Sequence, residues 1–129
     1  MIYTIKSELV GGMHMPEQEV IRTIRIGGSA SLDDLCEVML RSLDFDRDHM
    51  YQFCMDNNAH SRNAFISGSD RGGTASTKEK LYKLGLKTGK KFLFIYDFGD
   101  EWMFQMEVLE VENKSGNIRT ADRWGGCSP

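Results

Sequence analysis

Apolar side chains recur three and four positions apart in one stretch of this chain, residues 32–43. Together they make a single stripe of Leu32, Leu35, Cys36, Met39, Leu40 and Leu43. Ser31 stands at the N-cap position, and Asp33 and Asp34 follow at the positive end of the helix dipole. The pattern predicts a helix over residues 32–43 that rests with one side on a sheet.

Alternation of apolar and polar side chains predicts strands before and after this helix. The predicted strands cover residues 2–9, 19–26, 50–55, 91–96 and 101–112. Arg22 interrupts the apolar face of the second strand, where it either snorkels at an edge or lines a site. The fourth strand is apolar on both faces, which predicts an interior position in the sheet. In the fifth strand the alternation changes face near Leu109, which predicts a β-bulge.

Polar segments separate and follow these strands. Residues 56–77 are rich in Gly, Ser and Asn, and only residues 64–66 predict a short strand within them. Ser76 and Glu79 match a capping box for a short helix over residues 77–84.

The order of elements predicts the fold class. Residues 1–112 are expected to form a single domain, and residues 113–129 a polar C-terminal tail that is poorly ordered. The order β-β-α-β-(β)-β-β predicts a two-layer α+β fold with one main helix on a mixed β-sheet. The same order is similar to the β-grasp, or ubiquitin-like, pattern.

Length, charge and cysteine content limit the classes of function. A chain of 129 residues suits one domain, and its net charge of -3 argues against a dedicated nucleic-acid binder. No apolar run approaches a membrane span, and the N-terminus lacks the features of a secretion signal. Three widely spaced cysteines form neither a disulfide framework nor a metal-type pair. We therefore expect a cytoplasmic protein with no membrane partner.

The predicted turn between the last two strands concentrates acidic and aromatic side chains. Asp97, Asp100 and Glu101 bring three carboxylates to one turn, where they either bind a hard cation or simply hydrogen-bond the turn's own backbone. Trp102 either lines a pocket with neighbouring aromatic residues or belongs to the core. His49 follows an acidic run and, with Asp97 or Asp100, would form a small metal site; the alternative is a surface ion pair.

A basic segment lies between the polar loop and the fourth strand. Its lysines include Lys78, Lys80, Lys83 and Lys87, and only Glu79 opposes them in sequence. They would contact the phosphates of a nucleic acid, or they form a solvated face.

Two long stretches carry recognisable motifs. Residues 31–53 read SLDDLCEVMLRSLDFDRDHMYQF, and residues 86–108 read LKTGKKFLFIYDFGDEWMFQMEV. They resemble the plasmid pRiA4b ORF-3-like family, whose signature YDFGD-x-W lies in the second stretch. The resemblance covers most of residues 1–112 and implies a compact α+β domain often found near mobile elements, with no established reaction. Relatives often have histidines where this chain has Tyr51 and Phe104.

Three hypotheses of function follow. The first is a non-enzymatic binding module for a protein or small ligand, with no cofactor; its candidate residues are Tyr96, Asp97, Phe98, Asp100, Trp102 and Arg22. The second is a hydrolase assisted by a divalent metal held by His49, Asp97 and Asp100, with Glu101 as base. The third is a nucleic-acid accessory protein that uses the lysine-rich segment.

Overall fold

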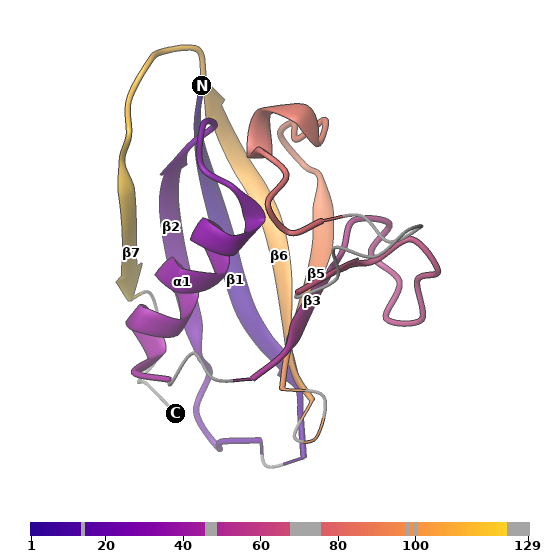
Figure 1. Cartoon of the computed structure of the whole chain (residues 1–129). Helices are drawn as coiled ribbons and strands as arrows, with labels where there is room; N and C mark the ends of the chain where they lie inside the picture. The colour runs from indigo at the N-terminus through magenta and orange to yellow at the C-terminus, as the bar shows by residue number, and fades with distance from the viewer. Residues whose placement is uncertain (14, 46–48, 68–75, 98, 100, 124–129) are drawn as a thin grey trace.

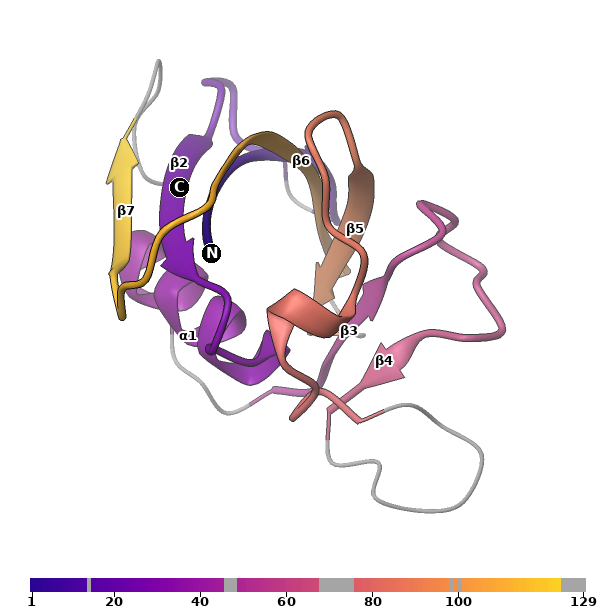
Figure 2. The ribbon, with the colours of Figure 1, turned by 90° about the horizontal axis from the view of Figure 1, so that it is seen from above.

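The computed structural model describes residues 1–13, 15–45, 49–67, 76–97, 99 and 101–123, which form a curved sheet with a helix packed on it (Figure 1). The strands are β1 (Ile2–Gly11), β2 (Ile21–Gly27), β3 (Tyr51–Cys54), β4 (Phe65–Ile66), β5 (Lys91–Tyr96), β6 (Trp102–Glu112) and β7 (Arg119–Arg123). Their order in the sheet is β4-β3-β5-β6-β1-β2-β7. Seen from above, the sheet curves round from β7 to β4, and the helix lies at the open side of the curve (Figure 2).

The helix α1 (Leu32–Leu43) begins and ends where the sequence predicts. The Asp34 N–H donates to Ser31 Oγ at 3.2 Å, and the Ser31 N–H donates to the Asp34 carboxylate at 2.9 Å. This reciprocal capping box satisfies two backbone donors that the helix start leaves unpaired. Asp44 ends the helix in the left-handed conformation, with φ 55°. All six residues of the predicted stripe are buried.

The main core fills the space between α1 and the concave face of the sheet. Alternate side chains of the strands point into it, among them Ile5, Ile24, Ile26, Phe53, Phe92, Phe94 and Phe104, all at most 1% exposed. The intervening side chains of β3 and β5 join a smaller cluster on the opposite face, made of Cys54, Ala64, Leu93 and Ile95. β5 is therefore apolar on both faces and lies between β3 and β6, as predicted.

Every pair of neighbouring strands that the structure describes is antiparallel. The α+β class with one main helix agrees with this arrangement, but the expected mixed sheet is wrong and the β-grasp order is not confirmed. β1 pairs on one edge with β2 and on the other with β6, and it runs antiparallel to both neighbours. Thr4 pairs with Glu110 and Ile5 with Val108, which leaves Leu109 as the extra residue of the predicted β-bulge.

The short helix predicted over residues 77–84 is reduced to a 3₁₀ turn, η1 (Leu81–Lys83). The chain before it runs beside the start of α1, where the Leu32 N–H donates to the Glu79 carbonyl and the Asp33 N–H to the Thr77 carbonyl. Ser76 closes a single turn here, since the Glu79 N–H donates to its carbonyl and the Lys78 N–H to its Oγ, and the bonds to α1 take up the carbonyls that a longer helix would use. The prediction is wrong because it considered local pairing alone.

β7 lies within the segment that was expected to be a tail. It pairs with β2 from Ile26 opposite Arg119 to Arg22 opposite Arg123. The expected tail over residues 113–129 is therefore wrong for Arg119–Arg123, which extend the sheet at the edge of β2. Residues 124–129 lie outside the described part of the chain.

Candidate functional site

Three connections of the fold meet around the turn between β5 and β6. The Asp97 N–H donates to the Met50 carbonyl at 2.9 Å, which joins this turn to the connection between α1 and β3. Gly12, at the end of β1, lies so close to Trp102 that a Cβ there would stand 3.3 Å from the indole ring. Asp97 and Trp102 therefore lie at one end of the sheet, next to two other loops.

Aromatic side chains form a cluster on the inner side of this turn. Phe45, which follows α1, packs on Tyr96 with ring centroids 6.1 Å apart and on Trp102 at 5.6 Å. Tyr96 is buried, whereas Phe45 and Trp102 are half-buried. The Trp102 ring packs against the core cluster, as one of the two predicted alternatives has it, while part of the side chain reaches the surface.

His49 and Asp97 are brought together, as the metal-site hypothesis requires. The His49 Nδ1 lies 3.7 Å from Asp97 Oδ2, and the imidazole meets Tyr96 edge-on at 5.8 Å between ring centroids. Asp97 also accepts a hydrogen bond on Oδ1 from the Gly99 N–H at 3.0 Å, so it stabilises its own turn as well. Phe98 and Asp100, the other predicted residues of the turn, lie outside the described residues. Across the described ranges, no three His, Cys, Asp or Glu side chains gather as a metal site.

The backbone is strained at both ends of the turn. Asp97 has φ 61° and Glu101 has φ 53°, both in the left-handed region. Asp tolerates this region through local hydrogen bonds, but Glu rarely adopts it. Strain of this kind costs about 1–3 kcal/mol per residue and tends to concentrate at functional sites.

The outer side of the turn borders a small pocket that the sequence analysis did not predict. Its volume is about 360 Å³, and its lining residues are Gln52, Ala59, His60, Ile95, Glu101 and Met103. Behind it lies the smaller apolar cluster, where burial and the nearby Asp56 raise the pKa of the Cys54 thiol. The Cys54 side chain is fully buried and packs in this cluster as a small apolar group.

Arg22 is placed differently from the other predicted binding residues. Its side chain is 1% exposed, and its guanidinium donates to the Ser42 carbonyl at 3.3 Å and to the Ile21 carbonyl at 2.9 Å. It therefore neither snorkels nor lies at an open surface, and it connects β2 to the last turn of α1.

The lysine-rich segment lies around η1, away from the β5–β6 turn. The predicted contact residues Lys78, Lys80, Lys83 and Lys87 are all exposed. Tyr82 stands among them, 56% exposed, and the Lys83 ammonium lies 5.8 Å from its ring centroid. The segment is fixed to the fold from beneath, because Leu81 is fully buried and the Tyr82 N–H donates to the Gly28 carbonyl.

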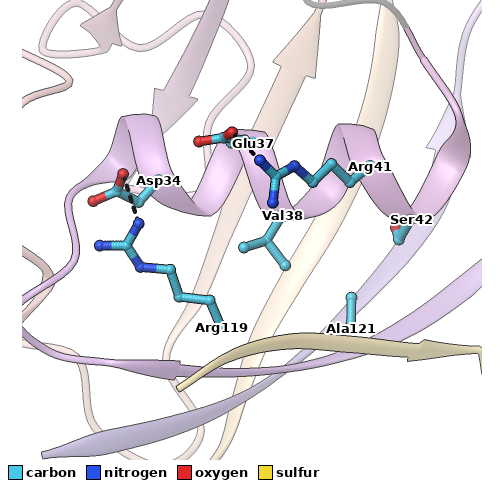
Figure 3. A pocket seen from close by; sticks show the side chains of 7 residues that line it. All are labelled: Asp34, Glu37, Val38, Arg41, Ser42, Arg119 and Ala121. Atoms are coloured by element: carbon cyan, nitrogen blue, oxygen red, sulfur yellow. Dashed lines mark hydrogen bonds and ion pairs between the residues drawn. The ribbon is translucent and has the colours of Figure 1, made fainter. Parts of the chain in front are cut away.

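A second concave feature separates α1 from β7, and it was missed because β7 itself was not predicted. This groove has a volume of about 500 Å³ and is lined by Asp34, Glu37, Val38, Arg41, Ser42, Arg119 and Ala121 (Figure 3). The polar face of α1 would have been the only signal in the sequence, and a polar helix face is ordinarily just solvated.

Comparison with known proteins assigns the chain to a family and finds a solved structure with a similar fold. A family model described as plasmid pRiA4b ORF-3-like protein matches residues 2–127. A crystal structure of a protein of unknown function from Methanosarcina mazei Go1 is similar, with a TM-score of 0.67 and 21% sequence identity. The match covers 92% of this chain and 67% of that one, and it shows a shared fold. No curated protein matches the chain. Within its described part, no helix is long and apolar enough to cross a membrane.

Proposed function

The chain belongs to the plasmid pRiA4b ORF-3-like family, and we propose that it is a non-enzymatic binding module that recognises its partner with the β5–β6 turn. The recognition surface consists of Asp97, Phe98, Asp100 and Trp102, and the buried Tyr96 supports it from beneath. The partner would be a protein segment that presents an apolar side chain to this end of the sheet. A role connected with mobile elements is part of the same proposal, on the basis of the family resemblance alone.

The strained turn is the observation that carries this proposal. Glu101 is held in a left-handed conformation, between a half-buried Trp102 on one side and a 360 Å³ pocket on the other. Exposed methionines surround this end of the sheet, since Met13 is 66% exposed and Met50 53% exposed. Methionine is flexible and polarizable, and it suits surfaces that adapt to an apolar partner. Aromatic anchors beside such a surface are typical of residues that dominate binding energy.

The test compares two substitutions in this surface with a matched one elsewhere. Partners captured by the wild-type chain are identified, and their affinities for Asp100→Ala and Trp102→Ala are measured by calorimetry. Loss of an aromatic anchor is expected to weaken binding by about 2 kcal/mol, or roughly thirtyfold. Tyr82→Ala removes another exposed aromatic ring and is expected to leave the affinity unchanged. If neither substitution in the turn lowers the affinity for any partner, the assignment of this surface is wrong.

A metal-assisted hydrolase is a second candidate, favoured by the approach of His49 to Asp97. Their ligand atoms lie 3.7 Å apart, and two ligands at about 2.0–2.2 Å from one zinc ion are separated by about 3.4 Å. Asp100 would supply the third ligand and Glu101 the base. Titration with zinc, magnesium and manganese, followed by the His49 ring resonances, tests this candidate. Resonances that do not respond to any of the three ions would exclude it.

A nucleic-acid accessory role is a third candidate, favoured by the exposed Tyr82 ring among lysines. Bases stack on such rings while lysines contact the phosphates. Binding of a labelled single-stranded oligonucleotide should then weaken steeply with salt and with Tyr82→Ala. An affinity for the oligonucleotide that does not change with salt concentration, or that Tyr82→Ala leaves unchanged, would exclude this candidate.

A further inference from the structure

β7 ends the sheet and leaves one of its edges without a described partner strand. It pairs with β2 along one edge, and it is the last strand in the order of the sheet. An edge strand presents a row of backbone N–H and C=O groups to which another extended chain can pair. Five residues at about 3.3 Å each give an edge of about 17 Å, enough for a peptide of similar length.

The groove between α1 and β7 lies beside this edge. Its described lining residues come from α1 and β7, so it opens between the helix and the last strand of the sheet. In Figure 3 the side chains of Arg119 and Ala121 rise from β7 toward the helix. A volume of about 500 Å³ falls within the range of ordinary ligand sites. A strand added to β7 would direct alternate side chains into this space.

The groove balances two arginines against two carboxylates, and the arginines are the groups that an acidic ligand reaches first. Arg119 lies 3.3 Å from the Asp34 carboxylate and Arg41 lies 2.7 Å from the Glu37 carboxylate. The guanidinium groups are the more accessible members of both pairs, at 47% against 26% and 78% against 33% exposed. A guanidinium has five N–H donors, so each retains donors for a second carboxylate. Asp34 is further held by the Ser31 N–H.

Two apolar side chains, Val38 and Ala121, line the groove between these ion pairs. Val38 is 8% exposed on the helix side, and Ala121 is half-buried on the strand side. Small side chains leave room there for one apolar residue of a ligand.

We propose that the groove binds an extended peptide of a partner protein, which adds as a further strand to the edge of β7 that has no partner among the described strands. An apolar side chain of the peptide sits between Val38 and Ala121, and an acidic side chain two residues away meets Arg41 or Arg119. Backbone pairing supplies affinity, and the alternate side chains supply specificity. The inference is independent of the β5–β6 turn, because the two surfaces share no residues.

A second copy of this chain is a poorer occupant in the register that centres on Ala121. Antiparallel pairing of two β7 strands about Ala121 would place residue 119 of one copy opposite residue 123 of the other. Both positions are arginine, and like charges directly opposite each other destabilise a pair of strands. A foreign peptide with acidic residues removes this repulsion.

The groove is also held in place before any ligand binds. Arg22 fixes the last turn of α1 through the Ser42 carbonyl, and the Gly27 N–H fixes the start of β7 through the Ile118 carbonyl at 2.9 Å. A preformed site loses little conformational entropy on binding.

The experiment uses a phage library of random seven-residue peptides selected on the full chain. The enriched peptides are expected to share an acidic and an apolar residue two positions apart. Their affinity should fall more than about tenfold in Arg119→Glu, since the substitution reverses a charge in the pair. Arg62→Glu, which makes the same charge change on an exposed loop, should have no effect. Ala121→Phe fills the groove and should also abolish binding, while the amide spectrum confirms that both variants remain folded.

Backbone pairing is tested separately with the selected peptide. N-methylation of the peptide residues whose N–H groups face β7 should abolish binding. N-methylation of the intervening residues, whose N–H groups face solvent, should be tolerated. Amide resonances of Arg119–Arg123 should shift on binding. Three results would overturn the proposal: no shared motif, binding that survives Arg119→Glu and Ala121→Phe, or self-association through β7. None of them would affect the test of the β5–β6 turn.

Discussion

Arg22 is the residue whose burial most needs an explanation. Its guanidinium is enclosed in the protein, although a charge costs several kcal/mol to remove from water without compensation. The compensation is found in carbonyl groups, because Ser42 and Ile21 both accept from it. Carbonyls at the end of a helix carry partial negative charge and lack partners within the helix. Arg22 therefore caps α1 from the neighbouring strand.

Replacing Arg22 should lower stability far more than replacing an exposed arginine. Arg22→Ala leaves a cavity and removes the donors to two carbonyls, and we expect the free energy of unfolding to fall by about 2–4 kcal/mol. Arg41→Ala, on the exposed face of α1, should change it by less than about 0.5 kcal/mol. Urea denaturation of the two variants and the wild type measures the difference. Equal effects of the two substitutions would contradict a structural role for Arg22.

The elements fixed by local signals are the ones that the sequence predicted well. α1 was predicted with its stripe and its cap, since both depend on residues within a few positions of each other. The bulge at Leu109 was visible as a change of face within one strand. η1 was mispredicted because the backbone before it pairs with the start of α1, far away in sequence.

The same reasoning explains the candidate sites. Asp97 and Trp102 lie in one turn, so sequence alone brought them together; the approach of His49 to Asp97 was a hypothesis that the geometry supports. The groove beside β7 could not be predicted. In Arg119–Arg123 only Ala121 is apolar, and the strand exists because β2 offers it an edge. Pairing across such a distance leaves little trace in a single sequence.

β7 depends on a close approach between two glycines. A Cβ added to Gly27 would lie 2.2 Å from the Gly116 carbonyl oxygen, on the connection that leads from β6 to β7. Backbone atoms at this distance cannot yield without moving the connection itself. The hydrogen bond from Gly27 to Ile118 anchors the same connection.

Gly27→Ala should therefore loosen β7 selectively. We expect faster hydrogen exchange at the amides of Arg119–Arg123 and a loss of about 1–3 kcal/mol in stability, as for other overpacked sites. Gly11→Ala is the matched control, because its nearest neighbour would be Met103 Cβ at 3.4 Å, an ordinary contact. Uniform acceleration of exchange across the sheet in Gly27→Ala would show that β7 does not open on its own.

At the scale of the whole molecule, one carboxylate links strands that are not neighbours. Glu112 at the end of β6 accepts from Arg25 of β2 at 2.8 Å and lies 2.9 Å from Lys114. β1 lies between β6 and β2, so the ion pair crosses over a strand on the convex side of the sheet. Hydrogen bonds from Lys114 and Arg25 lower the pKa of Glu112 below its ordinary value of 4.5.

The direction of this shift determines how stability depends on pH. Because the pKa of Glu112 is lower in the folded chain than in the unfolded chain, the charged carboxylate stabilises the fold above pH 4.5. That contribution is lost as the pH falls through the folded pKa, where Glu112 is protonated in both states. Glu112→Gln should therefore be less stable than the wild type near neutral pH and equally stable in acid.

Urea denaturation of both proteins between about pH 3 and pH 7 measures this difference. It should shrink near 1 M salt, where the Debye length is about 3 Å and exposed pairs are screened. Glu110→Gln, an exposed change on the same strand, should show no comparable dependence on pH. A difference between Glu112→Gln and wild type that persists in acid would mean that Glu112 acts through packing rather than charge. The link between β6 and β2 would then lie in β1 alone, which pairs with both strands.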